Sequence, residues 1–196
     1  MAKCQLVSVY TATTIAFVNS NPDTLTDSAS GFAGIAVGAS IVITGSTDNN
    51  KPVTVASVIA GTITLVGGDA LTAEIAGDLV SLTITVQFSP IRSAPPAQRY
   101  DYGAVELISK ISGTRFEYSN FKKFYDEVTV NNESKAHARQ YEAWREHQTS
   151  LTYTPNLDNS VVYYTCKLVN ESVPLEMRPD SLWDTAFHGT LQIREV

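Results

Sequence analysis

Ten residues from Leu79 to Phe88 read LVSLTITVQF, a run in which apolar and polar residues alternate. Because successive side chains of a β-strand point to opposite faces of the sheet, this pattern predicts a strand with one buried face. Shorter segments with strand character precede it, at 6–10, 14–18, 39–44, 53–58 and 62–66. Clusters of Asn, Gly, Ser and Pro, the usual turn residues, separate them. This regular spacing predicts a small all-β module, a sandwich or a barrel, over residues 1–88.

A proline-rich run follows at once. Residues 89–99 read SPIRSAPPAQR, and three prolines in eleven residues favour an extended backbone that lacks sheet donors. The charge pattern changes at the same place, because Lys3 and Lys51 are the only basic residues before position 90. We therefore interpret 89–99 as a linker between two modules.

The second predicted module spans residues 100–196. A long segment without Gly or Pro, near 132–148, predicts its one helix, with Asn132 as the N-cap. Tyr141 and Trp144 are three residues apart and would share the face of the helix that packs on the sheet. Strands are predicted around it, at 104–111, 115–118, 121–130, 149–154, 161–169 and 190–196. Residues 112–114 form the expected hairpin turn. The whole chain is thus predicted to be mainly β, with an α+β second module.

Composition limits the classes of partner. The chain has 196 residues, and its 43% hydrophobic content is enough for a substantial core. A net charge of -6 gives no broad positive surface for nucleic acid, so we expect no specific nucleic-acid binding. No apolar run approaches the ~20 residues that a membrane-spanning helix needs, so we expect no membrane partner.

The two cysteines and three histidines form no known ligand motif. Cys4 and Cys166 lie far apart in the sequence, and Cys166 is expected to be a buried thiol within an apolar strand. His137 and His147 are ten residues apart on the predicted helix and would face nearly opposite ways, whereas zinc helices place two histidines four apart. His188 precedes a glycine and is expected in a turn.

Other polar motifs have structural interpretations. Asp126 and Glu127 are adjacent in a strand, so they would point to opposite faces and could not act together as an acid pair. The Asp48-Asn49-Asn50 segment is expected to be a polar hairpin tip, because it lacks the rest of a calcium-binding loop. Gly31–Gly34 resembles a phosphate loop only superficially, since no helix is predicted after it. Lys122 and Lys123 lie among aromatics and are expected on one solvated strand face.

These observations predict no catalytic, cofactor-binding or metal-ligating residues, and hence a protein that is not an enzyme. The large aromatic residues of the second module are expected mostly in its core, with one or two at a subunit interface, where aromatics are enriched. They are Trp144, Trp183, Tyr163, Tyr164 and Phe187.

Both modules resemble structural proteins of tailed bacteriophages. The first is similar to a small β module that recurs in phage structural proteins, and the residues that carry the likeness are Ile15–Val18, Asn21–Asp27, Gly31-Phe32, Gly38, Ile41–Gly45, Asn49, Val53–Val58 and Thr62–Leu65. The sequence departs from this module at Asn50-Lys51-Pro52, where a glycine usually follows the asparagine shortly.

The second module resembles the tail-tube-like fold of distal-tail, tail-tip and baseplate-hub proteins, a β-sandwich with one helix. The likeness runs through Ser112–Phe116, Phe124-Tyr125-Asp126, the Trp144 helix, Leu151–Pro155 and Leu191–Val196. It implies a virion protein that is assembled in the host cytoplasm and forms or extends a ring at the end of the tail tube. Its implied partners are further copies of itself and neighbouring tail proteins, with DNA passing through the lumen and no cofactor.

A different class of function is a tail-fibre adaptor or receptor-binding module that recognises a host-surface glycan or protein. Glycan recognition commonly uses exposed aromatic rings, and residues 19–88 contain only Phe32 and Phe88, which counts against it. A cell-wall hydrolase carried on the tail would need an acid pair or a zinc ligand set, and ranks last.

Overall fold

The computed structural model describes residues 3–91, 99–108, 115–159, 162–177 and 187–196. Half of the chain is β-strand and 12% is helix, which confirms the prediction of a mainly β fold. The strands are β1 (Cys4–Ala12), β2 (Ile15–Val18), β3 (Thr24–Asp27), β4 (Ser40–Thr44), β5 (Pro52–Ile59), β6 (Thr62–Leu65), β7 (Val80–Phe88), β8 (Pro90–Ile91), β9 (Arg99–Ile108), β10 (Arg115–Glu133), β11 (Leu151–Thr154), β12 (Tyr164–Leu168), β13 (Leu175–Met177) and β14 (Phe187–Glu195). The helices are α1 (Lys135–Glu146) and two 3-10 turns, η1 (Gly31–Gly34) and η2 (Leu157–Asn159).

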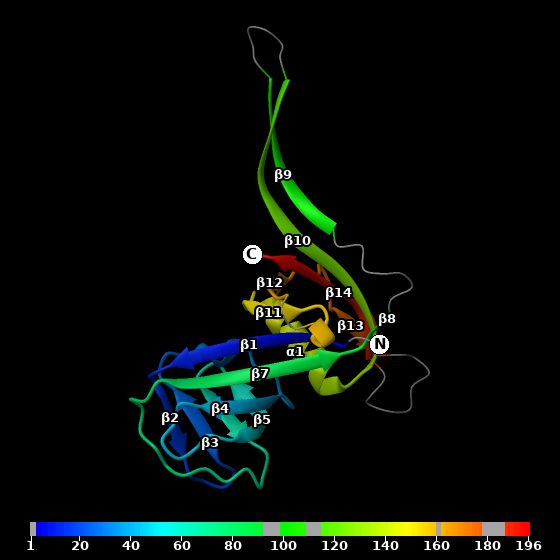
Figure 1. Ribbon diagram of the computed structural model, residues 1–196. Coiled ribbons are helices and arrows are strands. Elements are labelled where there is room, and N and C mark those ends of the chain that lie inside the picture. Colours follow the sequence, from blue (N-terminus) through cyan, green and yellow to red (C-terminus); the bar gives the residue numbers. More distant parts are fainter. Residues whose placement is uncertain (1–2, 92–98, 109–114, 160–161, 178–186) are drawn as a thin grey trace.

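The strands pair in the order β2-β3-β6-β5-β4-β7-β1-β11-β12-β14-β10-β8, with β13 added to β14 and β9 added to β10. β5 pairs with β4 through Pro52–Thr54 and with β6 from Val55 onward, with a register shift between Val55 and Ser57. Such irregularities bend a strand. The β2-β3-β6 layer therefore crosses the β4-β7-β1 layer and forms a small sandwich with it (Figure 1).

β7 is the strand that the alternating run predicted. Its apolar residues Val80, Leu82, Ile84, Val86 and Phe88 are all buried. It pairs with β1 over nine residues, from Cys4 opposite Phe88 to Ala12 opposite Val80, and with β4 on its other side. It is thus a central strand whose inner face forms one wall of the core.

β1 connects the two predicted modules. On one edge it pairs with β7, and on the other Gln5, Leu6 and Val7 pair with residues of β11. The sheet therefore continues from residues 1–88 into the second half of the chain without interruption. The buried residues of both halves also form one hydrophobic cluster. The module boundary predicted at residues 89–99 stays a prediction. Of the residues in this segment, 90–91 form β8, which pairs with β10, and 92–98 lie outside the described residues.

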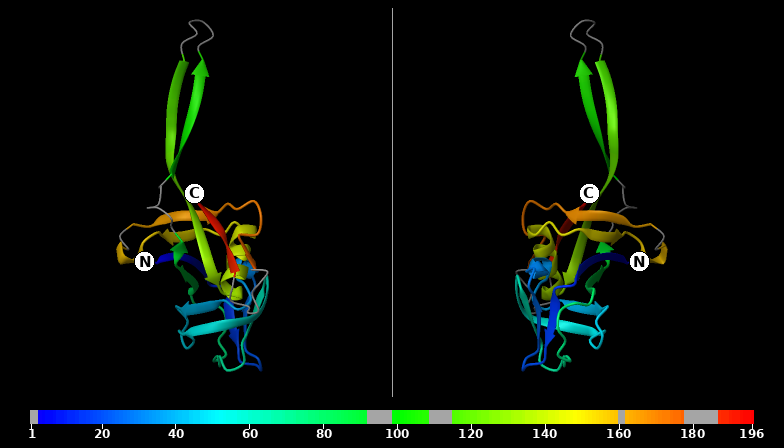
Figure 2. Two further views of the ribbon diagram at one scale, coloured as in Figure 1. Left: turned by 90° about the vertical axis from the view of Figure 1, so that its right-hand side faces the viewer. Right: turned by 90° about the vertical axis from the view of Figure 1, so that its left-hand side faces the viewer.

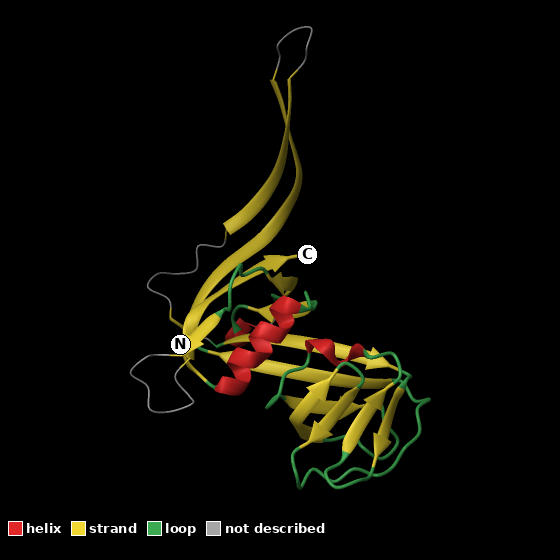
Figure 3. Cartoon of the chain, turned by 180° about the vertical axis from the view of Figure 1, so that it is seen from behind, coloured by secondary structure: helices red, strands yellow, loops and turns green. Residues whose placement is uncertain are grey.

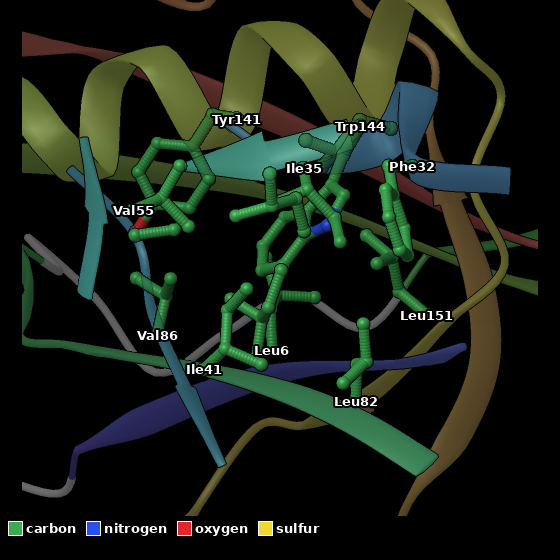
Figure 4. Close-up of a cluster of buried hydrophobic side chains, with 14 of the residues drawn as sticks. Leu6, Phe32, Ile35, Ile41, Val55, Leu82, Val86, Tyr141, Trp144 and Leu151 are labelled. Carbon is green, nitrogen blue, oxygen red and sulfur yellow. The ribbon is translucent and has the colours of Figure 1, made fainter. Parts of the chain in front are cut away.

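Helix α1 covers the inner side of this sheet (Figure 3). Tyr141 and Trp144 are both fully buried, as their spacing predicts. Figure 4 shows Trp144 pointing into the same core as Leu6 of β1 and Leu82 of β7. The Trp144 indole N–H donates to Ser8 Oγ at 3.1 Å, which ties the helix to β1.

A second polar contact joins α1 to the loop around η1. The Gln140 side chain is buried; its Nε2 donates to the carbonyl of Gly34 at 2.8 Å, and its Oε1 accepts from the amide of Ala36 at 3.0 Å. One amide side chain thus provides hydrogen-bond partners for the backbone of buried Ala36 and of half-buried Gly34.

The start of the helix differs from the prediction. Ser134, not Asn132, is the N-cap, and its hydroxyl accepts from the amide of His137 at 3.1 Å. The reason is that β10 continues to Glu133, which still pairs with Phe187 of β14. The predicted strands at 115–118 and 121–130 are accordingly one strand of 19 residues with a register shift between Ser119 and Lys122.

Other predictions had mixed outcomes. His188 lies within β14 rather than in a turn. Cys166 is buried as expected, and so is Cys4. Among the predicted aromatic anchors, Tyr164 and Phe187 pack partly buried against the core, whereas Tyr163 is 67% exposed. Trp183 and the predicted turn 112–114 lie outside the described residues.

Replacing Trp144 with alanine tests this core. Removal of a fully buried indole should lower the free energy of unfolding by about 3–5 kcal/mol, because it leaves a cavity and deprives the Ser8 hydroxyl of its hydrogen-bond donor. The measurement is urea denaturation followed by circular dichroism. Tyr163→Ala, at an exposed position, serves as the control and should change stability by less than about 0.5 kcal/mol. Equal losses in the two variants would contradict this description of the core.

Candidate assembly surfaces

The β9–β10 hairpin projects away from the rest of the chain (Figures 1 and 2). β9 pairs with β10 from Arg99 opposite Tyr125 to Ile108 opposite Arg115. Ten strand residues extend about 30 Å. Beyond Tyr125, toward the tip, the described strands give β10 no partner except β9. The hairpin is therefore a two-stranded ribbon, an arrangement that is at best marginally stable alone in water.

The backbone edges of this ribbon are its chemically important feature. Each strand of a two-stranded ribbon leaves alternate N–H and C=O groups directed outward, and these groups need hydrogen-bond partners. Within the described residues, the outer edge of β9 pairs with no strand. Such an edge is a template for the addition of a strand from another chain.

The base of the hairpin is firmly anchored. Val128 and Val130 of β10 are buried in the core. Between them and the ribbon lies Asp126, which is 5% exposed and accepts a hydrogen bond of 2.8 Å from the Tyr153 hydroxyl. Burial, together with the nearby Cys4 and Asp126, raises the pKa of Tyr153 far above its ordinary value, so this phenol stays protonated and keeps donating. The hairpin therefore extends from a rigid support.

At the opposite end of the sheet, the free edge of β2 is partly covered. The amide and carbonyl of Phe17 exchange hydrogen bonds of 2.8 and 2.9 Å with Glu74. The Glu74 carboxylate in turn accepts from the Ser46 hydroxyl, the Thr47 amide and the Asn49 side chain at 2.7–2.9 Å. Burial raises the pKa of Glu74, but these hydrogen bonds outweigh it and lower the pKa. Strand addition is thus impeded at β2, whereas no described strand occupies the outer edge of β9.

The hydrogen bonds of Asn49 show the structural role of residues 48–50. Asp48 is exposed, as a hairpin tip requires, whereas Asn49 is only 1% exposed. Its side chain donates to the Thr72 carbonyl and accepts from the Thr72 amide, at 3.0 and 2.8 Å. Asn49 therefore fastens the loop before β7 to the β4–β5 connection, a role that its position in a polar run did not indicate.

The glycine-rich segment also serves the fold. Gly31–Gly34 forms the turn η1, and Phe32 within it is fully buried. A Cβ atom on Gly31 would lie 2.0 Å from the Tyr10 hydroxyl oxygen, so only glycine fits there. The Gly31 amide donates to Asp27 at 2.8 Å. A side chain, rather than a phosphate, accepts this hydrogen bond.

The histidines lie apart from one another. His137 Nδ1 is 2.6 Å from Glu133 Oε2, an i,i+4 contact at the start of α1, and His147 is the C-cap of that helix. Within the described part of the chain, no three His, Cys, Asp or Glu residues are grouped as metal ligands would be. None of the described helices is long and apolar enough to cross a membrane. The side chains of Lys122 and Lys123 lie outside the description.

Compared with protein families, curated proteins and solved structures, this chain matches none.

Asp27 provides a pH test of the N-terminal half. It is 3% exposed and accepts from the Tyr10 and Thr14 hydroxyls at 2.6 and 2.5 Å and from the amides of Ala29 and Gly31. Burial raises its pKa, but the four hydrogen bonds outweigh burial and lower the pKa from 3.8 to about 2. A lowered carboxyl pKa stabilises the fold above pH 3.8, and this contribution is lost as the pH falls toward 2.

The protein should therefore lose about 2 kcal/mol of unfolding free energy through Asp27 between pH 4 and pH 2. In Asp27→Asn this part of the pH dependence should be absent, and the variant should be less stable at pH 7. Urea denaturation at a series of pH values measures both effects. Asp48→Asn, which changes an exposed carboxylate, is the matched control and should keep the native pH profile. A native profile in Asp27→Asn would refute the assignment.

Proposed function

We propose that this protein is a non-enzymatic structural subunit of a bacteriophage tail, which joins further copies of itself into a ring at the end of the tail tube or at the tail tip. The single observation that carries the proposal is the anchored β9–β10 hairpin, whose outer edge pairs with no strand among the residues that the structure describes. Beyond its base, the hairpin does not pair with the rest of the described sheet. We therefore infer that it serves to contact another chain.

Strand addition explains how the hairpin acts. A neighbouring chain that pairs with β9 supplies hydrogen-bond partners to its outer edge and converts a marginal ribbon into a three-stranded sheet. We propose that the surface that receives the hairpin is a different part of the neighbouring copy, which makes the contact heterologous. Repeated heterologous contacts close into a ring when the rotation permits, which is the geometry a tail tube requires.

The hydrogen-bonded acids fit a structural role. Asp27 and Asp126 are buried and Glu74 is half-buried, and each accepts hydrogen bonds from neighbouring donors that hold loops or strands in place. The assignment to a phage tail rests on the sequence resemblance to tail-tube-like proteins. That resemblance supports a position between the tube and other tail proteins, with DNA passing through the lumen.

Shortening the hairpin tests the assembly contact. Tyr102 pairs with Lys122, so replacing residues 103–121 by Asn-Gly rejoins two paired strands with a favoured two-residue turn. We expect the shortened protein to keep its far-ultraviolet circular dichroism and to lose higher-order assembly in light-scattering mass measurements. Ala60→Asn, at the tip of the β5–β6 hairpin, is the control and should assemble as the native chain does. Unchanged assembly of a folded, shortened protein would count against the hairpin.

The position in the virion needs a separate measurement. Phage particles from cells that carry this gene can be labelled with a gold-tagged antibody against the chain and viewed by electron microscopy. The proposal predicts label at the tail end or tip in every tailed particle. Labelled capsids, or particles without label, would contradict it.

A further inference from the structure

One broad sheet face carries no charge. It consists of the outward-facing residues of four neighbouring strands and one residue of β11. They are Gln5, Val7, Val9 and Thr11 of β1, Ser81, Thr83, Thr85 and Gln87 of β7, Ser40, Val42 and Thr44 of β4, Pro52 and Thr54 of β5, and Thr152 of β11. We name it the neutral face. All of its residues are Thr, Val, Ser, Gln or Pro, and all are exposed or half-buried. A surface designed for solubility is given roughly 25–35% charged residues.

The neutral face is open on its outer side. Of the described elements, Figure 1 shows only the turn η2 in front of these strands, at the N-terminal end of β1, whereas α1 lies on their opposite side in Figure 3. An uncharged and continuous surface of this kind is unusual for a chain with net charge -6. Depletion of charge is the feature that distinguishes the centre of a protein–protein interface from other surface.

A row of mostly apolar side chains, with Thr83 in it, crosses the middle of the face. Strand register places Val9 of β1 opposite Thr83 of β7, and Thr83 opposite Val42 of β4, whose other neighbour is Pro52. Val9 is 59% exposed and Val42 is 43% exposed. β-Branched side chains in adjacent strands have few rotamers to lose, so ordering them against a partner costs little entropy.

Its polar groups are partly satisfied within the face. Thr11 Oγ1 and Ser81 Oγ lie 2.8 Å apart, and Gln87 Nε2 donates to Gln5 Oε1 at 3.3 Å. Side chains that already bond to one another lose fewer hydrogen bonds to water when the surface is covered. Covering the face with a partner therefore costs little free energy, both at its two ends and at its centre.

We propose that the neutral face is a second interface, on which two copies of this chain pack sheet against sheet about a two-fold axis. This inference goes beyond the proposed function, since the face and the hairpin belong to different strands. Two acidic chains repel each other, and the repulsion is least where neither presents a charge. A charged partner, by contrast, would find no opposite charge to bind.

The size of the face agrees with this occupant. Each outward residue of a sheet covers about 33 Å², so the face offers on the order of 500 Å² and a pair of copies buries on the order of 1,000 Å². This area reaches the lower limit of specific interfaces. A two-fold axis brings the same patch together twice, and two flat sheets with small side chains pack about 10 Å apart in this manner.

Substitution at the centre tests the proposal. Thr83→Glu would place two carboxylates against each other near the axis, and we expect it to weaken the pairing of copies about ten-fold or more, as measured by sedimentation velocity across a concentration series. Thr83→Val keeps the shape and should pair at least as tightly as the native chain. Ile59→Glu adds the same charge at a 70% exposed position outside the face and should change the pairing less than two-fold.

A cysteine variant gives the geometry. Because Cys4 and Cys166 are both buried, Thr83→Cys adds one accessible thiol and should form a disulfide-linked dimer under mild oxidation, whereas Ile59→Cys should not. A native chain that never pairs, or pairing that Thr83→Glu leaves unchanged, would overturn the proposal. These variants leave the hairpin unaltered. If the hairpin proposal is wrong, Thr83→Glu should still weaken the pairing of copies through the neutral face. If the neutral-face proposal is wrong, the shortened hairpin should still abolish higher-order assembly.

Discussion

β1 pairs with β7 along its whole length and with β11 through Gln5, Leu6 and Val7, and the rest of the structure depends on this double pairing. It makes one sheet from strands of both halves of the chain, and it gives α1 a continuous surface to cover. Trp144 reinforces the same strand through its hydrogen bond to Ser8. Without these contacts, the base of β10 would lack the firm sheet from which the hairpin extends.

A sheet that is covered on one side by α1 and η1 has two features left for contact with other chains: its open face and its projecting ribbon. The structure treats them differently. The open face around Thr83 is neutral and its polar groups are partly bonded to one another, whereas the ribbon has backbone groups along β9 without a strand partner among the described residues. The free edge at β2 is instead bonded to Glu74. We therefore propose that assembly uses β9 and the neutral face, which together would suit a subunit of a stacked ring.

The sequence was informative where one local pattern dominates. The alternation around Leu82 predicts β7, and the spacing of Tyr141 and Trp144 predicts the buried face of α1. Local patterns could not show that β1 has two partners, because pairing between distant strands is decided by packing of the whole core. They also missed Asn49 and Gln140, whose roles depend on loops that meet only in the folded chain. The predicted start of α1 was wrong because both Asn132 and Ser134 are good N-caps, and the pairing of Glu133 with β14 selects Ser134.

The central claim is that this chain assembles with itself through the anchored hairpin. The most direct test is negative-stain electron microscopy of the purified full-length protein over a range of concentrations. Light scattering measures the mass of the particles in the same samples. Closed rings with a central hole, whose mass is a whole multiple of the 21.3 kDa chain, are the predicted result. A monodisperse 21.3 kDa monomer at every concentration would contradict the account.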